Sequence, residues 1–290
     1  MSAPLFPRIA LFGAGLIGGS FALGLKAAGA VGEVVGIDRS PAHAARAREL
    51  GVIDRVADTP AAALDGCDLV VLAAPVAQTG TLLRALRPHL GAGTLITDVG
   101  STKSDVVAAA RAELGADVAR FIPGHPVSGG ERHGPDAARA DLFRKRKVVL
   151  TPLAENRDED VARIRAAWEA CGARVTTLSP AQHDQVLASV SHLPHLLAYA
   201  LVAQIANAPD GDLRFEFGGG GFRDFTRIAA SSPEMWRDIA LANRAALLTE
   251  IDGYSAMLDQ LRAMIERGDG AALEALFTLA SQKRLNWKLD

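Results

Sequence analysis

A histidine followed by proline, in Gly124-His125-Pro126, is the first residue in this sequence whose type and setting suit acid–base chemistry. The proline holds the preceding residue in an extended conformation, and the nearby glycines leave room beside the ring. A side chain with a pKa near neutrality can take a proton from a hydroxyl while hydride leaves the same carbon. A purely structural loop histidine is the alternative. A position directly after a predicted strand favours the catalytic interpretation.

A glycine-rich turn supplies the partner for such chemistry. Gly13, Gly15 and Gly18 form a GxGxxG pattern between an apolar run at 8–12 and an apolar segment at 20–28. In a strand-turn-helix setting they permit a tight turn, close approach of the backbone to a pyrophosphate, and close helix packing. Leu16 and Ile17 lie in the same turn, at the helix N-terminus that receives phosphates. The alternative is that the glycines only end a strand.

An acidic residue completes this dinucleotide pattern. Asp38 follows a second predicted strand at 33–37, where its carboxylate can bind the ribose hydroxyls and repel a 2′-phosphate. We therefore expect NAD as the cofactor, with NADP less favoured because Arg39 beside Asp38 weakens the discrimination. The alternative is that Asp38 caps the helix after Pro41. Ala74 and Pro75, directly after the next strand, are further candidates for cofactor contact.

Polar residues recur at three further places. Ser101 follows the predicted strand 94–98 and either caps the next helix or serves the site. Ser191 and His195 share one face of an otherwise apolar helix, which costs stability unless they are paired or line a cavity. Arg223 and Arg227 share another helix face, and either could clamp a carboxylate. One of these arginines could instead pair with Asp224, so the sequence leaves the choice open.

The elements that carry these residues fall into two groups. Strands and helices alternate up to about residue 178, which predicts a doubly wound, mainly parallel Rossmann-type sheet. Only helices are predicted beyond it, at about 180–207, 222–230, 233–242, 244–267 and 270–284. We therefore expect an α/β dinucleotide-binding domain at 1–179 and an all-α substrate-binding and dimerisation domain at 180–290. The helix containing Leu193 to Ile205 is apolar almost all round, which predicts burial in a homodimer.

Composition narrows the class of protein. The 290 residues carry a net charge of −2 without long runs of one sign, so no nucleic acid or anionic membrane is expected as a partner. Cys67 and Cys171 show neither metal-ligand spacing nor a disulfide framework, and we expect no metal. The apolar stretches around 69–77 and 196–206 are shorter than the roughly 20 residues that span a bilayer. No cleavable signal is evident, so a soluble, cytoplasmic protein is expected.

Taken together, these motifs resemble the prephenate/arogenate (cyclohexadienyl) dehydrogenases of tyrosine biosynthesis over essentially the whole chain. The motifs that carry the resemblance are the glycine loop, Asp98 to Lys103, the histidine-proline loop with Gly129 and Glu131, Ser191-His192-Leu193-Pro194-His195, and Asp224 to Ala229 with Pro233, Met235, Trp236 and Asn243. The resemblance implies NAD-dependent oxidative decarboxylation of prephenate to 4-hydroxyphenylpyruvate and CO2, and arogenate as a second candidate substrate. It also implies a dimer through the helical domain.

The resemblance implies a role for each site residue. His125 would help to remove the proton of the ring hydroxyl, supported by Ser101, and Arg227 would hold a substrate carboxylate. His195 would line the site, with Ser191, Glu131 and Trp236 as further substrate contacts. Two alternatives remain. A β-hydroxyacid-type NAD(P) dehydrogenase would need a lysine where this chain has Ser191 and His195. A non-catalytic NAD sensor would not need these polar residues together.

Overall fold

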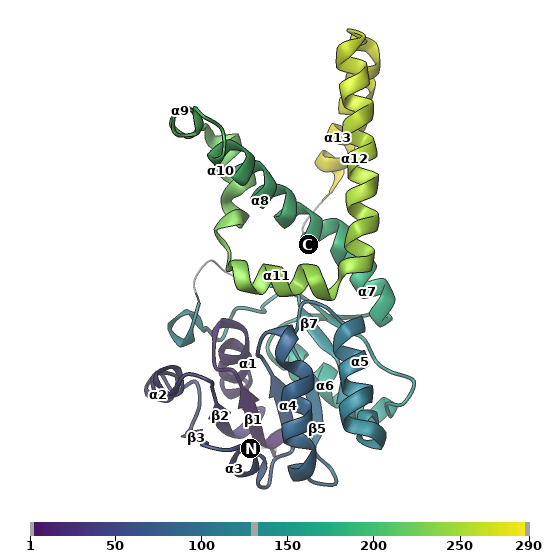
Figure 1. Cartoon of the computed structure of the whole chain (residues 1–290). Coiled ribbons are helices and arrows are strands. Elements are labelled where there is room, and N and C mark those ends of the chain that lie inside the picture. Colours follow the sequence, from purple (N-terminus) through teal and green to yellow (C-terminus); the bar gives the residue numbers. More distant parts are fainter. Residues whose placement is uncertain (1–2, 129–132, 288–290) are drawn as a thin grey trace.

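The computed structural model describes residues 3–128 and 133–287, and its first half is built on a parallel sheet (Figure 1). The sheet has six strands in the order β3-β2-β1-β4-β5-β6, and every described pairing within it is parallel. This order places the crevice of a dinucleotide-binding fold where the direction of winding reverses, between β1 and β4. Its strands are β1 (Phe6–Phe12), β2 (Val31–Ile37), β3 (Arg55–Val56), β4 (Leu69–Leu72), β5 (Leu95–Asp98) and β6 (Phe121–Ile122).

Helices cover both faces of this sheet, as the predicted doubly wound class requires. They are α1 (Leu16–Ala27), α2 (Pro41–Glu49), α3 (Pro60–Leu64), α4 (Thr79–Leu86), α5 (Ser104–Leu114) and α6 (Asp158–Ala170). Side chains of β1 alternate between two cores. Ile9 and Leu11 belong to the core that includes α1 and α6, whereas Ala10 and Phe12 belong to the core that includes α3, α4 and α5. The predicted fold class is confirmed.

A second, smaller sheet was not predicted. It contains β7 (Gly124–Pro126), β8 (Lys147–Leu150) and β9 (Arg174–Thr177), with β7 antiparallel to β8 and β8 parallel to β9. The sequence predicted strands at 147–151 and 174–178, but it placed His125 in a loop. That placement is wrong: His125 lies within β7 and pairs with Val149. A strand of three residues, of which the first is glycine and the last is proline, is too short for hydrophobic periodicity to reveal it.

The second half is helical, as predicted. A Ser179–Gln182 capping box starts α7 (Pro180–Leu187), and a π-helical turn at 188–192 joins it to α8 (Leu193–Ala206). The remaining helices are α9 (Gly211–Glu216), α10 (Gly220–Thr226), α11 (Pro233–Ala242), α12 (Arg244–Glu266) and α13 (Gly270–Asn286). Only α9 was missed. In Figure 1, α11 crosses above the α/β half while α8 and the α12–α13 pair rise from it as two separate arms.

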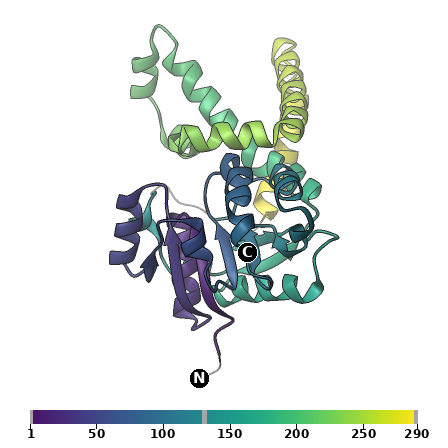
Figure 2. The ribbon, with the colours of Figure 1, turned by 60° about the horizontal axis from the view of Figure 1, so that its bottom comes forward.

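The helix formed by α7 and α8 corrects one expectation. Residues 180–206 are continuous, and by length and composition they form the one described helix that could cross a membrane. The expectation that no stretch is long enough to span a bilayer is therefore wrong. It counted only the apolar run at 196–206 and left out the helical turns before it, which are more polar. Those turns bury His183, Asp184 and His192, which are hydrogen-bonded to the rest of the protein. Figure 2 shows both arms leaving the same end of the α/β half.

Candidate active site

A single cavity of about 1740 Å³ lies between the carboxyl ends of the parallel strands and the helical half. This volume exceeds the roughly 300–1,000 Å³ of a pocket for one small ligand, so it has room for a dinucleotide and a second molecule. Every predicted site residue within the described ranges lines it: Gly13, Gly15, Leu16, Ile17, Gly18, Asp38, Arg39, Ala74, Pro75, Ser101, His125, Ser191, His195, Arg227 and Trp236. Glu131 lies outside the described residues.

The glycine turn has the geometry that a dinucleotide requires. Gly13 has a φ of +97°, and a Cβ there would lie 2.5 Å from the carbonyl oxygen of Ala73. A Cβ on Gly18 would lie 2.3 Å from the carbonyl oxygen of Gly13, so this position keeps α1 close to β1. A Cβ on Gly15 would meet no protein atom within 4 Å. Gly15 is also the N-cap of α1 without a side-chain cap, which leaves the helix N-terminus able to receive phosphate.

Asp38 is fixed at the end of β2. Its Oδ2 accepts a hydrogen bond from the Ala14 N–H at 3.3 Å, and its Oδ1 accepts one from the Ser40 N–H at 2.9 Å. The alternative in which Asp38 caps the next helix is wrong, because the N-cap of α2 is Ser40, whose hydroxyl accepts the His43 N–H. Asp38 and Arg39 both line the cavity, as an adenosine ribose site requires.

His125 lies in β7 on the floor of the cavity and is 8% exposed. The Gly124 N–H before it donates to Asp98 Oδ1 at 3.1 Å, which ties β7 to the end of β5. Burial is the main cause that lowers the pKa of His125 well below its ordinary value of 6.5, and the neighbouring ammonium of Lys103 acts in the same direction. The imidazole is therefore neutral at neutral pH and able to accept a proton.

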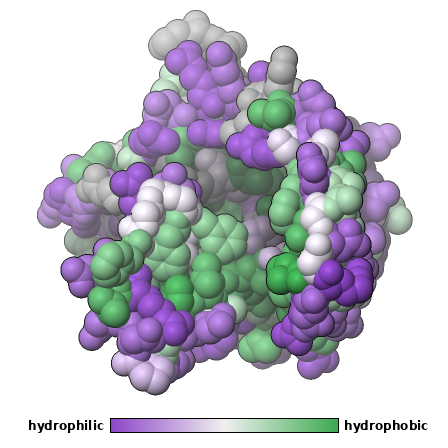
Figure 3. Space-filling view, turned by 90° about the horizontal axis from the view of Figure 1, so that it is seen from above, coloured by the Kyte–Doolittle hydropathy of each residue, from purple (hydrophilic) through white to green (hydrophobic). Residues whose placement is uncertain are grey.

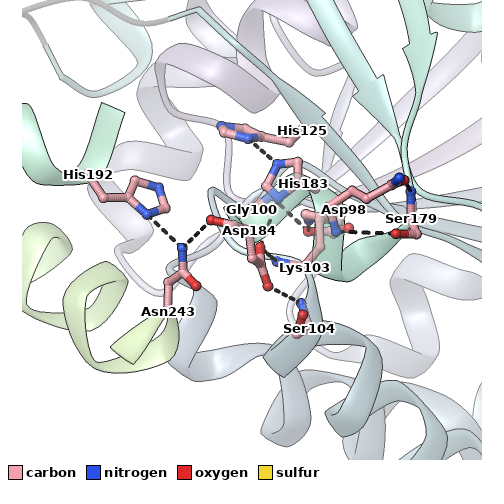
Figure 4. A network of polar contacts seen from close by, with 11 residues as sticks. Asp98, Gly100, Lys103, Ser104, His125, Ser179, His183, Asp184, His192 and Asn243 are labelled. Carbon is pink, nitrogen blue, oxygen red and sulfur yellow. Dashed lines mark hydrogen bonds and ion pairs between the residues drawn. The ribbon is translucent and has the colours of Figure 1, made fainter. Parts of the chain in front are cut away.

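A buried polar network surrounds this histidine (Figure 4). His125 Nδ1 lies 2.8 Å from His183 Nε2, and His183 Nδ1 lies 2.8 Å from Asp184 Oδ1. Asp184 also accepts the backbone N–H groups of Lys103 at 2.8 Å and Ser104 at 2.7 Å, so a residue of α7 caps α5. The interpretation of Ser101 as the cap of α5 is therefore wrong. Ser101 lines the cavity instead.

Two further contacts complete the network. The Lys103 ammonium forms a fully buried ion pair with Asp98 Oδ2. The Asn243 amide donates to the Asp184 carbonyl oxygen at 2.8 Å and lies 3.1 Å from His192 Nδ1. Burial lowers the pKa of His192 to about 4, so this ring is neutral as well. The network therefore joins β5, α5 and β7 to α7 and the start of α12.

The helical half contributes the opposite wall of the cavity. His195 Nδ1 lies 2.9 Å from the Ser191 carbonyl oxygen, and the His195 ring stacks on Trp236 with 3.6 Å between centroids. The indole Nε1 of Trp236 is buried and has no hydrogen-bond partner among the described residues. Arg227 lines the cavity, whereas Arg223 forms an exposed ion pair with Asp224 at 3.4 Å. The helical wall of the cavity thus combines a positive charge with aromatic surface.

Sequence reasoning assigned no role to His183, Asp184, His192 or Asn243, although His192 and Asn243 belong to the motifs that carry the resemblance. His183 and Asp184 lie in a short polar helix, where polar side chains are ordinarily exposed, so nothing in the sequence indicated their burial. An asparagine after a helix, as at Asn243, also suits an ordinary end of that helix. Among the described residues, no group of three or more His, Cys, Asp or Glu side chains could hold a metal ion.

Comparisons with known proteins agree with this site. Residues 21–177 match the family model "Prephenate dehydrogenase, nucleotide-binding domain", and residues 179–279 match "Prephenate dehydrogenase, dimerization domain". The cyclohexadienyl dehydrogenase of Zymomonas mobilis is 38% identical over 99% of this chain and 98% of its own length. Prephenate dehydrogenase of Aquifex aeolicus, solved with hydroxyphenyl propionate and NAD+, superposes with a TM-score of 0.91 at 35% identity, covering 96% of this chain and 97% of that one.

A third relative differs in its named substrate. Arogenate dehydrogenase of Synechocystis superposes with a TM-score of 0.81 at 31% identity, covering 96% of this chain and 98% of that one. Both family models together span nearly the whole chain, and their junction lies between the last strand, β9, and the first helix of the helical half, α7. A dinucleotide turn, a buried histidine and a cationic helical wall thus occur together in a chain with these relatives. The chain belongs to the prephenate dehydrogenase family.

Proposed function

We propose that this protein catalyses the NAD-dependent oxidative decarboxylation of prephenate to 4-hydroxyphenylpyruvate and CO2, a step of tyrosine biosynthesis. The observation that carries the proposal is the position of His125, between the dinucleotide turn and the cationic wall of one cavity. A dehydrogenase needs its base beside the carbon that gives up hydride, and this cavity offers one neutral, buried imidazole at that place.

The cofactor is supported by the shape of the turn. The open space beside Gly15 admits a pyrophosphate, and Asp38 is held by two backbone N–H groups where ribose hydroxyls would bind. A carboxylate at this point opposes a 2′-phosphate, which favours NAD over NADP. Leu16, Ile17, Ala74 and Pro75 would contact the dinucleotide, with Arg39 beside its ribose. Bound NAD supplies the acceptor for the hydride that leaves the substrate ring.

The chain's own residues supply the remaining chemistry. His125 takes the proton of the ring hydroxyl, and Ser101 hydrogen-bonds to the same hydroxyl or to His125. Loss of the ring carboxylate as CO2 then completes an aromatic ring, which makes the reaction strongly downhill. The site lies between the two halves, where bound cofactor and substrate would displace water from the reacting carbon.

The substrate carries two carboxylates, and the helical wall is suited to them. Arg227 would hold one through its planar guanidinium. His195 and Ser191 would line the ring, while the unpartnered Nε1–H of Trp236 would donate to a substrate oxygen. Glu131 remains a candidate substrate contact. Prephenate and arogenate differ by a keto or an amino group on the side chain, and we propose both as substrates because relatives named for either are similar over nearly the whole chain.

The helical half of the chain indicates how the protein assembles. We propose two domains, at 1–179 and 180–290, a homodimer through the second, and a cytoplasmic location. Large apolar side chains of α12 and α13 are exposed in the single chain, and the matching family model is a dimerisation domain. The rival β-hydroxyacid activity lacks support, because residues 180–206 contain no lysine.

The test is NADH formation with prephenate and then with arogenate, comparing the wild type with His125→Asn. Asparagine retains a hydrogen bond but cannot accept the proton, so kcat should fall by roughly 10²–10⁴-fold. The matched control is His89→Asn, which changes an exposed histidine outside the cavity and should leave kcat unchanged. Absence of turnover with both substrates, or full activity of His125→Asn, would overturn the proposal.

A further inference from the structure

The proton positions on the two hydrogen-bonded histidines, His125 and His183, follow from the carboxylate of Asp184. Burial raises the pKa of Asp184, but the hydrogen bonds from His183 and Ser104 outweigh it and bring the pKa to about 2. Asp184 is therefore a carboxylate, which can only accept hydrogen bonds. Its Oδ1 lies 2.8 Å from His183 Nδ1, so this nitrogen must carry the proton.

The proton position on His183 in turn determines the one on His125. A neutral imidazole protonated at Nδ1 has a lone pair at Nε2, and His183 Nε2 lies 2.8 Å from His125 Nδ1. His125 must therefore donate from Nδ1. Its other nitrogen, Nε2, is then left unprotonated, and this is the nitrogen of His125 not engaged by His183 (Figure 4). The hydrogen bonds thus produce the tautomer that can act as a base.

This tautomer needs support, because neutral imidazole in water favours the proton on Nε2. With that tautomer, His125 would offer the substrate hydroxyl a donor where the reaction needs an acceptor. His125 is also buried, so the positive charge that it gains on taking a proton has little solvent to stabilise it. The carboxylate of Asp184, which is hydrogen-bonded to His183, favours a positive charge on His125. The third residue of a catalytic triad orients and stabilises its base in the same way.

We propose that His183 and Asp184 are positioning residues that lock His125 in the Nδ1–H tautomer and stabilise its protonated form. In the reaction, the hydroxyl proton moves to His125 Nε2 while His125 Nδ1–H stays hydrogen-bonded to His183. Both positioning residues belong to α7 and His125 belongs to β7, so the base becomes competent only where the helical half docks on the α/β half. The proposal rests on the proposed function insofar as His125 is the base.

The informative variants change His183. Asp184 is unsuitable because it also caps α5, and its loss would disturb the fold. His183→Leu removes the acceptor for His125 Nδ1–H. His183→Gln retains a carbonyl oxygen near the place of Nε2, so it can still accept that hydrogen bond although it cannot itself be protonated. His89→Leu, at an exposed position, is the matched control.

The first readout is the 15N NMR spectrum of the histidine rings, with the His125 signals identified by their absence in His125→Asn. Wild type, His183→Gln and His89→Leu should show His125 protonated at Nδ1, and His183→Leu should shift the population towards Nε2–H. The second readout is steady-state kinetics. His183→Leu should lower kcat by roughly 10²-fold, at the low end of general base catalysis, with KM within about twofold, and His183→Gln should recover most of that loss.

The two proposals fail in different ways. If the wild type turns over neither substrate, the proposed function fails, while the NMR spectrum still tests the lock. If the wild type is active but His183→Leu retains its kcat, or keeps His125 in the Nδ1–H tautomer, the lock is wrong. A fall in kcat that His183→Gln does not relieve would also overturn it, because it would indicate a structural role alone.

Discussion

The two halves of the molecule stabilise themselves in different ways. The α/β half contains both described hydrophobic cores, built from alternating faces of one sheet. The helical half contributes only seven of the described buried apolar residues. Seventeen of the nineteen large apolar side chains that are exposed in the described chain belong to it. The α/β half therefore buries its apolar side chains within one chain, whereas the helical half needs a second surface to cover its own.

The exposed apolar residues are grouped in space. Figure 3 looks down on the arms and shows apolar side chains around a central hollow, with hydrophilic ones outside. Patches of this extent on a protein mark an interaction site. The family model that matches this half describes a dimerisation domain, which supports the proposed homodimer. A sequence can therefore have the apolar composition of a core without forming a core within one chain.

The first prediction tests the self-sufficient half. Trp168 is fully buried, with its ring 4.2 Å from Phe21 and 5.1 Å from Phe143 between centroids. Trp168→Ala should lower the free energy of unfolding by about 3–5 kcal/mol, because it leaves a large cavity. Urea denaturation measures the loss, which should not depend on protein concentration. Trp287→Ala, at an exposed tryptophan, should cost about 0.5 kcal/mol or less at low concentration. An equal loss of unfolding free energy in both variants would contradict the proposed difference between the two halves.

The second prediction tests the half that needs a partner. Leu258 in α12 and Phe277 in α13 are 48% and 57% exposed. The double variant Leu258→Glu/Phe277→Glu should weaken the dimer at least roughly 100-fold, about 2.7 kcal/mol, because two charges would be buried without partners. Sedimentation equilibrium measures the dissociation constant. Leu50→Glu changes an exposed leucine of the α/β half and should leave the dimer intact. A wild-type chain that sediments only as monomer would contradict this assignment.

The same contrast explains what the sequence could predict. The α/β half follows local rules: the GxGxxG turn, a strand before it and Asp38 after the next strand are set by short-range geometry. The doubly wound class of the sheet and the cofactor turn were therefore predictable. The sequence could not predict β7, because a three-residue strand is defined by pairing with Val148 to Leu150 rather than by its own residues.

The site divides in a similar way. Residues that face a ligand could be chosen by type, such as His125, Arg227 and His195. Residues that act through others could not, because His183 and Asp184 matter only once α7 is docked on α5 and β7. The capping of α5 illustrates this, since Ser101 fits the local rule for an N-cap but a carboxylate from 80 residues along the chain takes that place. Long-range contacts of this kind leave no periodic signal.

The third prediction concerns His192, at the junction of the two halves, where the expected effect is smallest. Burial lowers the pKa of His192 from 6.5 to about 4, so the unfolded chain binds a proton more readily than the folded protein between these values. Stability is therefore full above about pH 6.5 and is lost as the pH falls towards 4. From the two values, His192 alone should cost about 2 kcal/mol at pH 5 relative to pH 7. Denaturation at a series of pH values measures the slope.

His192→Gln isolates this contribution, because glutamine does not titrate in this range. The variant should be less stable than wild type at pH 7, since Asn243 loses its ring partner, but its stability should fall less steeply between pH 6.5 and 5. Some slope must remain, because burial lowers the pKa of His125 and of His195 in the same direction. His89→Gln, at the surface, should keep the wild-type slope. If His192→Gln keeps it too, His192 does not contribute to the acid sensitivity, and its protonation does not loosen the junction of the two halves.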